Sequence, residues 1–239
     1  MLSTIRVLST RAVQGALPVL IARFEGATGA QVATDLGPTN ALIARIKAGE
    51  RADATILTRE GADELVGLGI LDGASAADLV RSVVGLAVKA GAPTPDIGTA
   101  EALKATLLAA KSISYSRHGA SGVFFAGLIE RLGIAEAVNA KATIVPTGLT
   151  GEPVARGDVE MAVQQVSELK AVPGLDIVGP LPASLQTPSV FSAAVFASAA
   201  GVTLARAFIE TLASPEAAPA FTAAGLEPLA REPQGEGRS

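Results

Sequence analysis

Short runs of apolar and β-branched residues alternate along this chain with longer segments whose apolar positions recur every three or four residues. The short runs predict strands, and the periodic segments predict helices that bury one face. The first strand is expected at Ile5–Leu8. A helix is expected over 12–26, where helical spacing joins Val13, Leu17, Leu20, Ile21 and Phe24. Strands that alternate with helices are typical of βαβ units around a largely parallel sheet.

The same pattern continues to the end of the chain. Further strands are predicted at 31–36, 54–58, 81–90, 112–116, 143–148, 161–165, 175–182 and 190–198. Further helices are predicted at 40–49, 60–68, 99–110, after 118–122 as far as 131–133, and at 150–157, 201–213 and 215–224.

Two of the predicted strands, 81–90 and 190–198, would carry the chain from one lobe to another and back. The first lobe is then built from both ends of the chain, 1–82 and 197–230. The second lobe is the middle segment, 83–196, and a cleft lies between the two. The sequence therefore predicts a two-lobed α/β protein.

Composition narrows the function classes. Hydrophobic residues make up 49% of the chain and charged residues 18%, as in a globular protein. The net charge of −4 argues against general affinity for nucleic acid or for an anionic membrane surface. Cysteine is absent and His118 is the single histidine, which excludes a disulfide framework, a thiolate nucleophile and a multi-histidine zinc site. Nothing in the sequence indicates a metal or a cofactor.

The ends of the chain carry two further expectations. No run approaches 18 uninterrupted apolar residues, so we expect no membrane insertion. Arg6 and Arg11 interrupt the first apolar stretch, which does not resemble a signal peptide. We therefore expect a cytoplasmic protein, or a periplasmic one if a signal peptide has been removed. The last residues, 231–239, are rich in glycine, proline and charge, and we expect them to be disordered.

Four predicted strand-to-helix junctions carry small hydroxyl, amide or glycine residues. They are Ser9-Thr10-Arg11, Pro38-Thr39-Asn40, Gly119-Ala120-Ser121-Gly122 and Thr147-Gly148-Leu149-Thr150. Helix N-termini present unpaired N–H groups and a positive dipole end, and both attract anions. Each hydroxyl could instead be an N-cap for its own helix. If the junctions face one cleft, they predict a site for a small anion.

Several charged and amide side chains lie near these junctions. Arg11 could bind a carboxylate through both guanidinium edges, or it could be a solvated surface residue. His118 and Glu168 are candidates for acid–base catalysis. Their alternatives are a surface histidine and a carboxylate that stabilises the first turn of a helix. Gln164 and Gln165 are adjacent on a strand, so we expect at most one of them to face the cleft.

Five segments, taken in order, resemble the ModA-type molybdate-binding proteins of the class II periplasmic binding proteins. They are IRVLSTRAVQGALPVLIARFEGATGAQV, LGPTNALIARIKAG, RADATILT, GASGVFFAGLIERLGI and GDVEMAVQQVSEL. The resemblance covers residues 4–228. It implies a type II periplasmic-binding-protein-like fold, with mixed, mostly parallel sheets flanked by helices and a ligand in the interdomain cleft. It also implies a small anion as ligand and an ABC transporter membrane component as a partner.

The resemblance also implies which residues surround the ligand. Donors of the family fall here at Ala12, Thr39, Ser121, Thr150 and Gln165, and the neighbouring residues Ser9, Thr10, Arg11, Asn40 and Gly122 complete the predicted binding set. Ala12 has no hydroxyl, and Gln165 stands where the family has a tyrosine. These two departures favour an organic carboxylate over molybdate, because an oxyanion would lack two partners.

Two segments, YSRHGASGVFFAGLIERLGI and QQVSELKAVPGLDIVGPLP, are also similar to the aconitate isomerase branch of this superfamily. That similarity implies a rival function in which a base shifts the double bond of a tricarboxylate. His118, Glu168 or Tyr115 would be the base, with Arg11 and Thr39 as anchors for the carboxylates. The sequence thus leaves a carboxylate-binding protein and an isomerase as alternatives, and it leaves open whether the chain is an enzyme.

Overall fold

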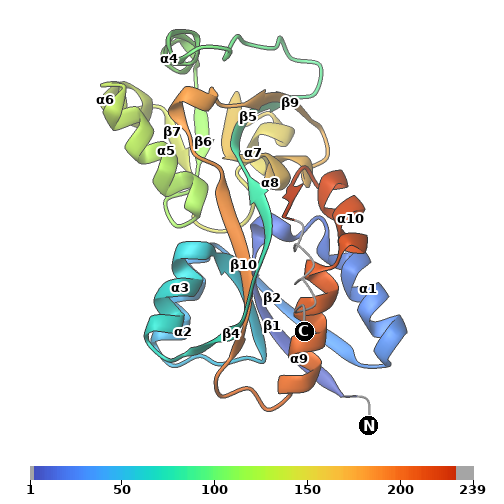
Figure 1. Ribbon diagram of the computed structural model, residues 1–239. Coiled ribbons are helices and arrows are strands. Elements are labelled where there is room, and N and C mark those ends of the chain that lie inside the picture. The colour runs from blue at the N-terminus through green and yellow to red at the C-terminus, as the bar shows by residue number, and fades with distance from the viewer. Residues whose placement is uncertain (1–2, 230–239) are drawn as a thin grey trace, which may run out of the picture.

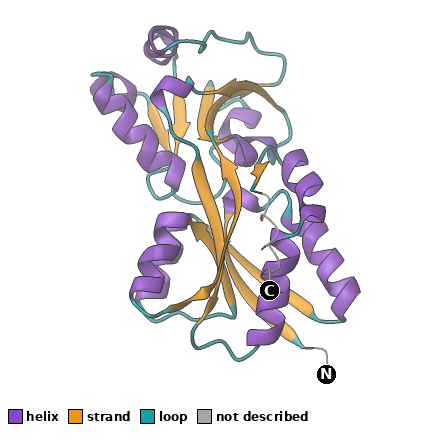
Figure 2. Cartoon of the chain, in the orientation of Figure 1, coloured by secondary structure: helices purple, strands orange, loops and turns teal. Residues whose placement is uncertain are grey.

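Two separate β-sheets divide the chain into two lobes (Figure 1). This computed structural model describes residues 3–229. The strand order is β11-β4-β10-β3-β1-β2 in the first sheet and β7-β6-β8-β5-β9 in the second. Helices cover both sheets, which confirms the predicted two-lobed α/β architecture (Figure 2). No helix within 3–229 has the length and apolar character needed to cross a membrane.

The first lobe holds the beginning and the end of the described chain. Its strands are β1 (Thr4–Thr10), β2 (Gln31–Gly37), β3 (Ala54–Thr58), β4 (Leu71–Ser82), β10 (Ser189–Phe196) and β11 (Glu227–Pro228). Its helices are η1 (Arg11–Val13), α1 (Leu17–Thr28), α2 (Thr39–Lys47), α3 (Arg59–Gly67), α9 (Val202–Ala213), η3 (Pro215–Ala217) and α10 (Ala218–Ala223).

Apolar residues hold these helices against the two faces of the first sheet. On one face, α1 and α9 meet through Phe24 and Phe208, whose rings lie 5.2 Å apart edge to face. On the other face, α2 and α3 bury Leu42, Ile46 and Leu65. The sheet is therefore the middle layer of three.

The second lobe is the middle of the chain. Its strands are β5 (Val84–Lys89), β6 (Ile113–Tyr115), β7 (Ala142–Ile144), β8 (Met161–Gln165) and β9 (Leu175–Pro180). Its helices are α4 (Ala100–Ala109), α5 (Ala120–Arg131), α6 (Ala135–Asn139), α7 (Glu152–Arg156) and α8 (Val166–Lys170), with the short η2 (Ala183–Leu185). The apolar sides of α4, α5 and α6 share one core, and α7 and α8 pack on the opposite face.

Two chain crossings join the lobes. One is immediate, because β4 ends at Ser82 and β5 begins at Val84 in the other sheet. The other precedes β10, which pairs antiparallel with both β3 and β4. We predicted that the first lobe resumes at 197, but β10 already belongs to its sheet from Ser189. Figure 1 shows the two crossing strands, β4 and β10, side by side along the long axis of the molecule.

Both sheets are mixed. β1 runs parallel to β2 and β3, and β6 runs parallel to β7 and β8. The antiparallel pairs arise where β10, β4 and β5 enter or leave a sheet. Parallel strands place their carboxyl ends at one edge, so the junctions after β1, β6 and β8 face the gap between the lobes.

The first predicted helix is interrupted in the structure. The helix expected over 12–26 is split into η1 and α1, and Pro18 lies in the first turn of the second piece. Proline lacks an N–H group and is favoured at a helix start, so α1 begins there. The predicted tail, 231–239, lies outside the described residues.

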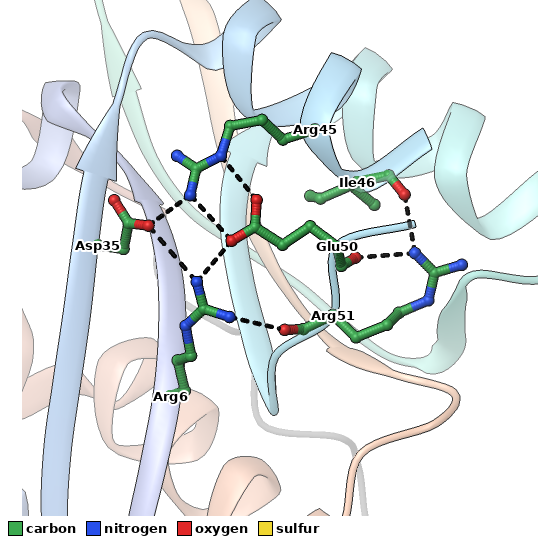
Figure 3. A network of polar contacts seen from close by, with 6 residues as sticks. All are labelled: Arg6, Asp35, Arg45, Ile46, Glu50 and Arg51. Carbon is green, nitrogen blue, oxygen red and sulfur yellow. Dashed lines mark hydrogen bonds and ion pairs between the residues drawn. The ribbon is translucent and has the colours of Figure 1, made fainter. Parts of the chain in front are cut away.

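A network of charged side chains lies in the first lobe (Figure 3). Arg45 of α2 binds Glu50 at 2.6 Å and Asp35 of β2 at 2.5 Å, and Arg6 of β1 binds the same two carboxylates. Hydrogen bonds from Arg45 hold the pKa of Asp35 and of Glu50 below their usual values. The network therefore joins β1, β2 and the loop after α2.

Candidate functional site

A narrow cavity lies between the two lobes, at the ends of β1 and β8. It is lined by Thr10, Arg11, Ala12, Pro38, Thr39, Ser116, Gly119, Ala120, Ser121, Gly148, Gln164, Gln165, Glu168 and Phe191. The lobes meet so closely that the cavity has about 20 Å³ of room, little more than one water molecule requires. A ligand of several non-hydrogen atoms therefore does not fit into the cavity as it stands.

Two threonine hydroxyls come from the first lobe. Thr10 ends β1 and caps η1, accepting the N–H of Ala12 at 3.4 Å. Thr39, in the first turn of α2, donates its hydroxyl to the Thr10 hydroxyl at 3.0 Å. Both side chains are buried. The Thr10 hydroxyl accepts both bonds, so its own hydrogen can be donated to a ligand.

The N-terminus of α5 faces the cavity from the second lobe. Gly119 is the N-cap, and the N–H groups of Ala120 and Ser121 lie in the first turn, where a helix supplies no acceptor. The Ser116 hydroxyl accepts the N–H of Gly119 at 3.3 Å and orders the preceding loop. A Cβ on Gly122 would lie 1.5 Å from the Ser116 carbonyl oxygen, so only glycine allows this close approach.

Glu168 is the most unusual group in the cavity. It lies in the first turn of α8, and only 8% of its surface is exposed. Burial raises its pKa from 4.5 to about 7, although the charge of Arg11 and hydrogen bonds from the Gln165 backbone and the Gln164 side chain oppose this rise. A carboxyl group with this pKa can both accept and donate a proton near neutral pH.

Gln164 and Gln165 both line the cavity, which corrects the prediction that at most one of them faces the cleft. Strand alternation ends here because Gln165 is also the N-cap of α8, with φ −56° and ψ 137°. The side-chain oxygen of Gln164, Oε1, accepts the backbone N–H of Thr150 at 2.8 Å and the Thr150 hydroxyl at 2.9 Å. Thr150 therefore fixes the side chain of Gln164, which lowers the pKa of Glu168 against the larger effect of burial.

Three buried polar atoms at the cavity lack a hydrogen-bond partner among residues 3–229. They are Nε of Arg11 and both amide atoms of Gln165, Oε1 and Nε2. Gln165 is 1% exposed, so its amide is buried in the wall of the cavity. Buried polar groups without partners are rare in folded proteins, and here they lie where a ligand would bind.

The cavity collects most of the residues that the sequence indicated. Thr10, Arg11, Ala12, Thr39, Ser121, Gln165 and Glu168 line it. Five other predicted residues, Ser9, Asn40, Gly122, Thr150 and His118, are absent from the lining.

Each of these five has a local reason for its position. Ser9 is buried and donates its hydroxyl to the Thr10 carbonyl. Asn40 and His118 are exposed to solvent, so His118 is not placed to act as a base in the cavity. Gly122 packs on the Ser116 backbone, and the donors of Thr150 are used by Gln164.

Sequence reasoning missed three contributors. Gln164 was set aside by the alternation argument. Ser116 directly follows β6 and orders the loop before α5, a role that only its position three residues before Gly119 could have indicated. Phe191 comes from β10, and no local signal connects that strand to junctions more than 25 residues away.

Comparison with known proteins supports this architecture. Residues 5–227 match the bacterial extracellular solute-binding protein family. An aconitate isomerase from a Pseudomonas species is 36% identical over 237 residues, which cover 97% of this chain and 90% of that protein.

Solved structures of periplasmic binding proteins share the fold. The periplasmic molybdate-binding protein of Azotobacter vinelandii superposes with a TM-score of 0.78 at 19% identity, over 96% of this chain and 100% of that one. The sulfate-binding protein SubI of Mycobacterium tuberculosis H37Rv gives 0.73 at 18% identity, over 95% and 87%. These matches confirm the resemblance to ModA-type binding proteins.

Proposed function

The chain belongs to the bacterial extracellular solute-binding protein family, and on this premise we propose that it closes on a small polycarboxylic acid and isomerises it. Glu168 would move a proton between two carbons of the ligand, which shifts a double bond. This is the enzymatic alternative that the sequence left open, and the geometry of the cavity favours it over binding alone.

The observation that carries the proposal is the position of Glu168. An ionised carboxyl group beside a bound anion would repel it, so a site that only binds an anion is not expected to place one there. Burial raises the pKa of Glu168 to about 7, so the neutral and the ionised forms are both populated near pH 7. A group that changes protonation near neutral pH inside a ligand cavity is suited to acid–base catalysis.

Arg11 supports a carboxylate as the anion. Its guanidinium lines the cavity from the lobe opposite Glu168, and its Nε is buried without a partner in the described chain. A guanidinium can bind a carboxylate through two parallel hydrogen bonds. Ala12 supplies no hydroxyl at the neighbouring position, so a tetrahedral inorganic anion would find fewer donors here.

The 36% identical relative, named aconitate isomerase, supports a tricarboxylate as the substrate. In the proposed step, the Glu168 carboxylate removes a proton from the saturated carbon beside the double bond. The electron pair of that C–H bond forms a new double bond, and the displaced pair takes the proton back from Glu168 at the far carbon. Atoms and electrons balance without an oxidant or a reductant.

Closure of the lobes gives the second part of the mechanism. The cavity is too small to admit an organic acid as it stands, so binding requires opening at the crossings that precede β5 and β10. Arg11 and Thr39 belong to the first lobe, and Glu168 and Ser121 belong to the second. Only the closed arrangement brings Arg11, which binds the carboxylate, close to Glu168, the base. A ligand that contacts both lobes stabilises this closed arrangement.

A solute-binding protein that delivers its ligand to an ABC transporter is the second candidate. The family and the molybdate- and sulfate-binding structures favour it. The two functions differ in one respect, because delivery requires binding and no chemistry at carbon.

Proton NMR of cis- and trans-aconitate in D₂O with the purified protein separates the candidates. Isomerisation should interconvert the two acids, and deuterium should enter the ligand to the extent that the proton on Glu168 exchanges with solvent before its return. Glu168→Gln should abolish both reactions while trans-aconitate still binds, and His118→Ala, at an exposed position outside the cavity, should leave the rate unchanged. Tight binding with no conversion and no deuterium exchange by the native chain would instead assign it to delivery.

A further inference from the structure

The unpartnered side-chain amide of Gln165 indicates which chemical groups the ligand presents to it. The positions of Arg11 and Glu168 do not indicate this. Its Nε2 is a donor and its Oε1 is an acceptor, and both are buried without partners in the described part of the chain. A ligand carboxylate offers acceptors alone. It could satisfy Nε2, but it would leave the buried acceptor Oε1 without a partner, which is unfavourable.

A neutral carboxylic acid matches both atoms. Its carbonyl oxygen accepts from Nε2 and its O–H donates to Oε1, which forms a closed ring of two hydrogen bonds. We propose that Gln165 binds one carboxyl group of the substrate in this protonated form, so that binding takes up a proton from solution. The inference rests on the proposed function, because it concerns the substrate of that same cavity.

The charges around the cavity support a neutral group at this position. Of the described residues that line it, Arg11 on η1 and Glu168 on α8 are the titratable ones; β1, α2, α5, β8 and β10 contribute only uncharged lining side chains. One guanidinium can neutralise one carboxylate. A polycarboxylate held as a full polyanion would bury further charges without partners, and each such burial is costly.

The protonated form also helps the proposed chemistry. Removing a proton from a carbon conjugated to a carboxylate places two negative charges on one group. Removing it from a carbon conjugated to a neutral acid places one charge there, and the Gln165 amide is already positioned to donate to the oxygen that receives it. Gln165 would therefore contact the substrate and lower the barrier to proton removal by Glu168.

Isothermal titration calorimetry with trans-aconitate tests this inference. Binding is measured in buffers of different ionisation enthalpy near pH 7, which gives the number of protons taken up per complex. The measurement uses Glu168→Gln, because this variant removes the other titrating carboxyl and stops turnover. A second variant adds Gln165→Met, a side chain of similar length without hydrogen-bonding groups, and Gln31→Met on the exposed edge of β2 is the matched control.

We expect uptake approaching one proton per complex in Glu168→Gln and in the variant that adds Gln31→Met. Affinity in both should weaken as the pH rises above 7. Adding Gln165→Met should abolish the uptake. If Gln165→Met prevents binding, the uptake in Glu168→Gln alone decides the question.

Uptake near zero in Glu168→Gln overturns the inference, as does uptake that persists when Gln165 is replaced. Neither result affects the proposed function, provided that the native chain still converts the acids. Failure of the native chain to bind either aconitate would refute the proposed function and the inference with it.

Discussion

Glu168 should make the stability of the free protein fall as the pH rises, and its replacement by glutamine should remove this effect. The folded-state pKa of about 7 lies above the ordinary value of 4.5. Between these two pH values the folded protein holds one more proton than the unfolded chain. The stability from the neutral carboxyl is thus fully present below pH 4.5 and is lost as the pH rises through 7.

The magnitude follows from the same two values. At about 1.4 kcal/mol per pH unit, the rise from 4.5 to about 7 corresponds to about 3 kcal/mol well above pH 7. At pH 5 only a small part of this penalty is present. The free energy of unfolding of Glu168→Gln minus that of the native chain should therefore grow by about 2–3 kcal/mol between pH 5 and pH 8.

Urea unfolding of both proteins at pH 5, 6, 7 and 8 measures this difference, and any constant effect of the amide cancels in the comparison. Glu101→Gln is a matched control, because Glu101 also lies in the first turn of a helix, α4, and is exposed. Its difference from the native chain should stay constant across the series. A difference for Glu168→Gln that does not change with pH would refute the argument that burial controls this carboxyl.

Three further predictions test other parts of the molecule. Arg11→Met should weaken binding of trans-aconitate by about 10- to 100-fold, the loss of one charge-assisted pair, while the unfolding midpoint stays within error; unchanged affinity in calorimetry would place the anion elsewhere. Gly122→Ala should lower the free energy of unfolding by at least about 2 kcal/mol, because the new Cβ meets the backbone of Ser116. Gly127→Ala in the same helix has room and should instead stabilise it by about 0.5–1 kcal/mol, so equal effects at the two positions would contradict the packing argument. Arg45→Met should cost about 1 kcal/mol at pH 7, since its ion pairs are partly exposed, and the loss should vanish as the pH falls below the lowered pKa values of its two carboxylate partners; a loss that persists once both carboxylates are protonated would show that packing, not charge, is responsible.

Most helices and strands could be predicted because local pattern determines them. The strand at 54–58 agrees with β3 residue for residue, since a short run rich in β-branched and apolar residues is buried on both faces. β4 could not be found this way, because LDGASAADLV shows neither alternation nor a continuous apolar run. It is a strand because β10 and β11 pair with it from positions far along the chain.

The candidate site likewise contains residues that local sequence predicts and contacts between lobes that it does not. Residues at strand-to-helix junctions, such as Thr10 and Ser121, could be named from local sequence because each junction is a local structure. That Arg11 of one lobe and Glu168 of the other meet in one cavity depends on how the lobes pack. The burial that raises the pKa of Glu168 also depends on how the lobes pack. The sequence could therefore name Glu168 as a candidate base but could not show the raised pKa that suits it to this role.

The pairing of β4 with β10 has a consequence for the order in which the protein acquires its structure. The two strands are partners in one sheet, yet β4 ends at Ser82 and β10 begins at Ser189, with the whole second lobe between them. During synthesis from the N-terminus, the second lobe has all of its strands before the ribosome has made the strand that completes the first sheet. The second lobe can then fold from nearer contacts, and its folding brings the two ends of a long loop together. The first lobe, which begins first in the sequence, would be the last to fold.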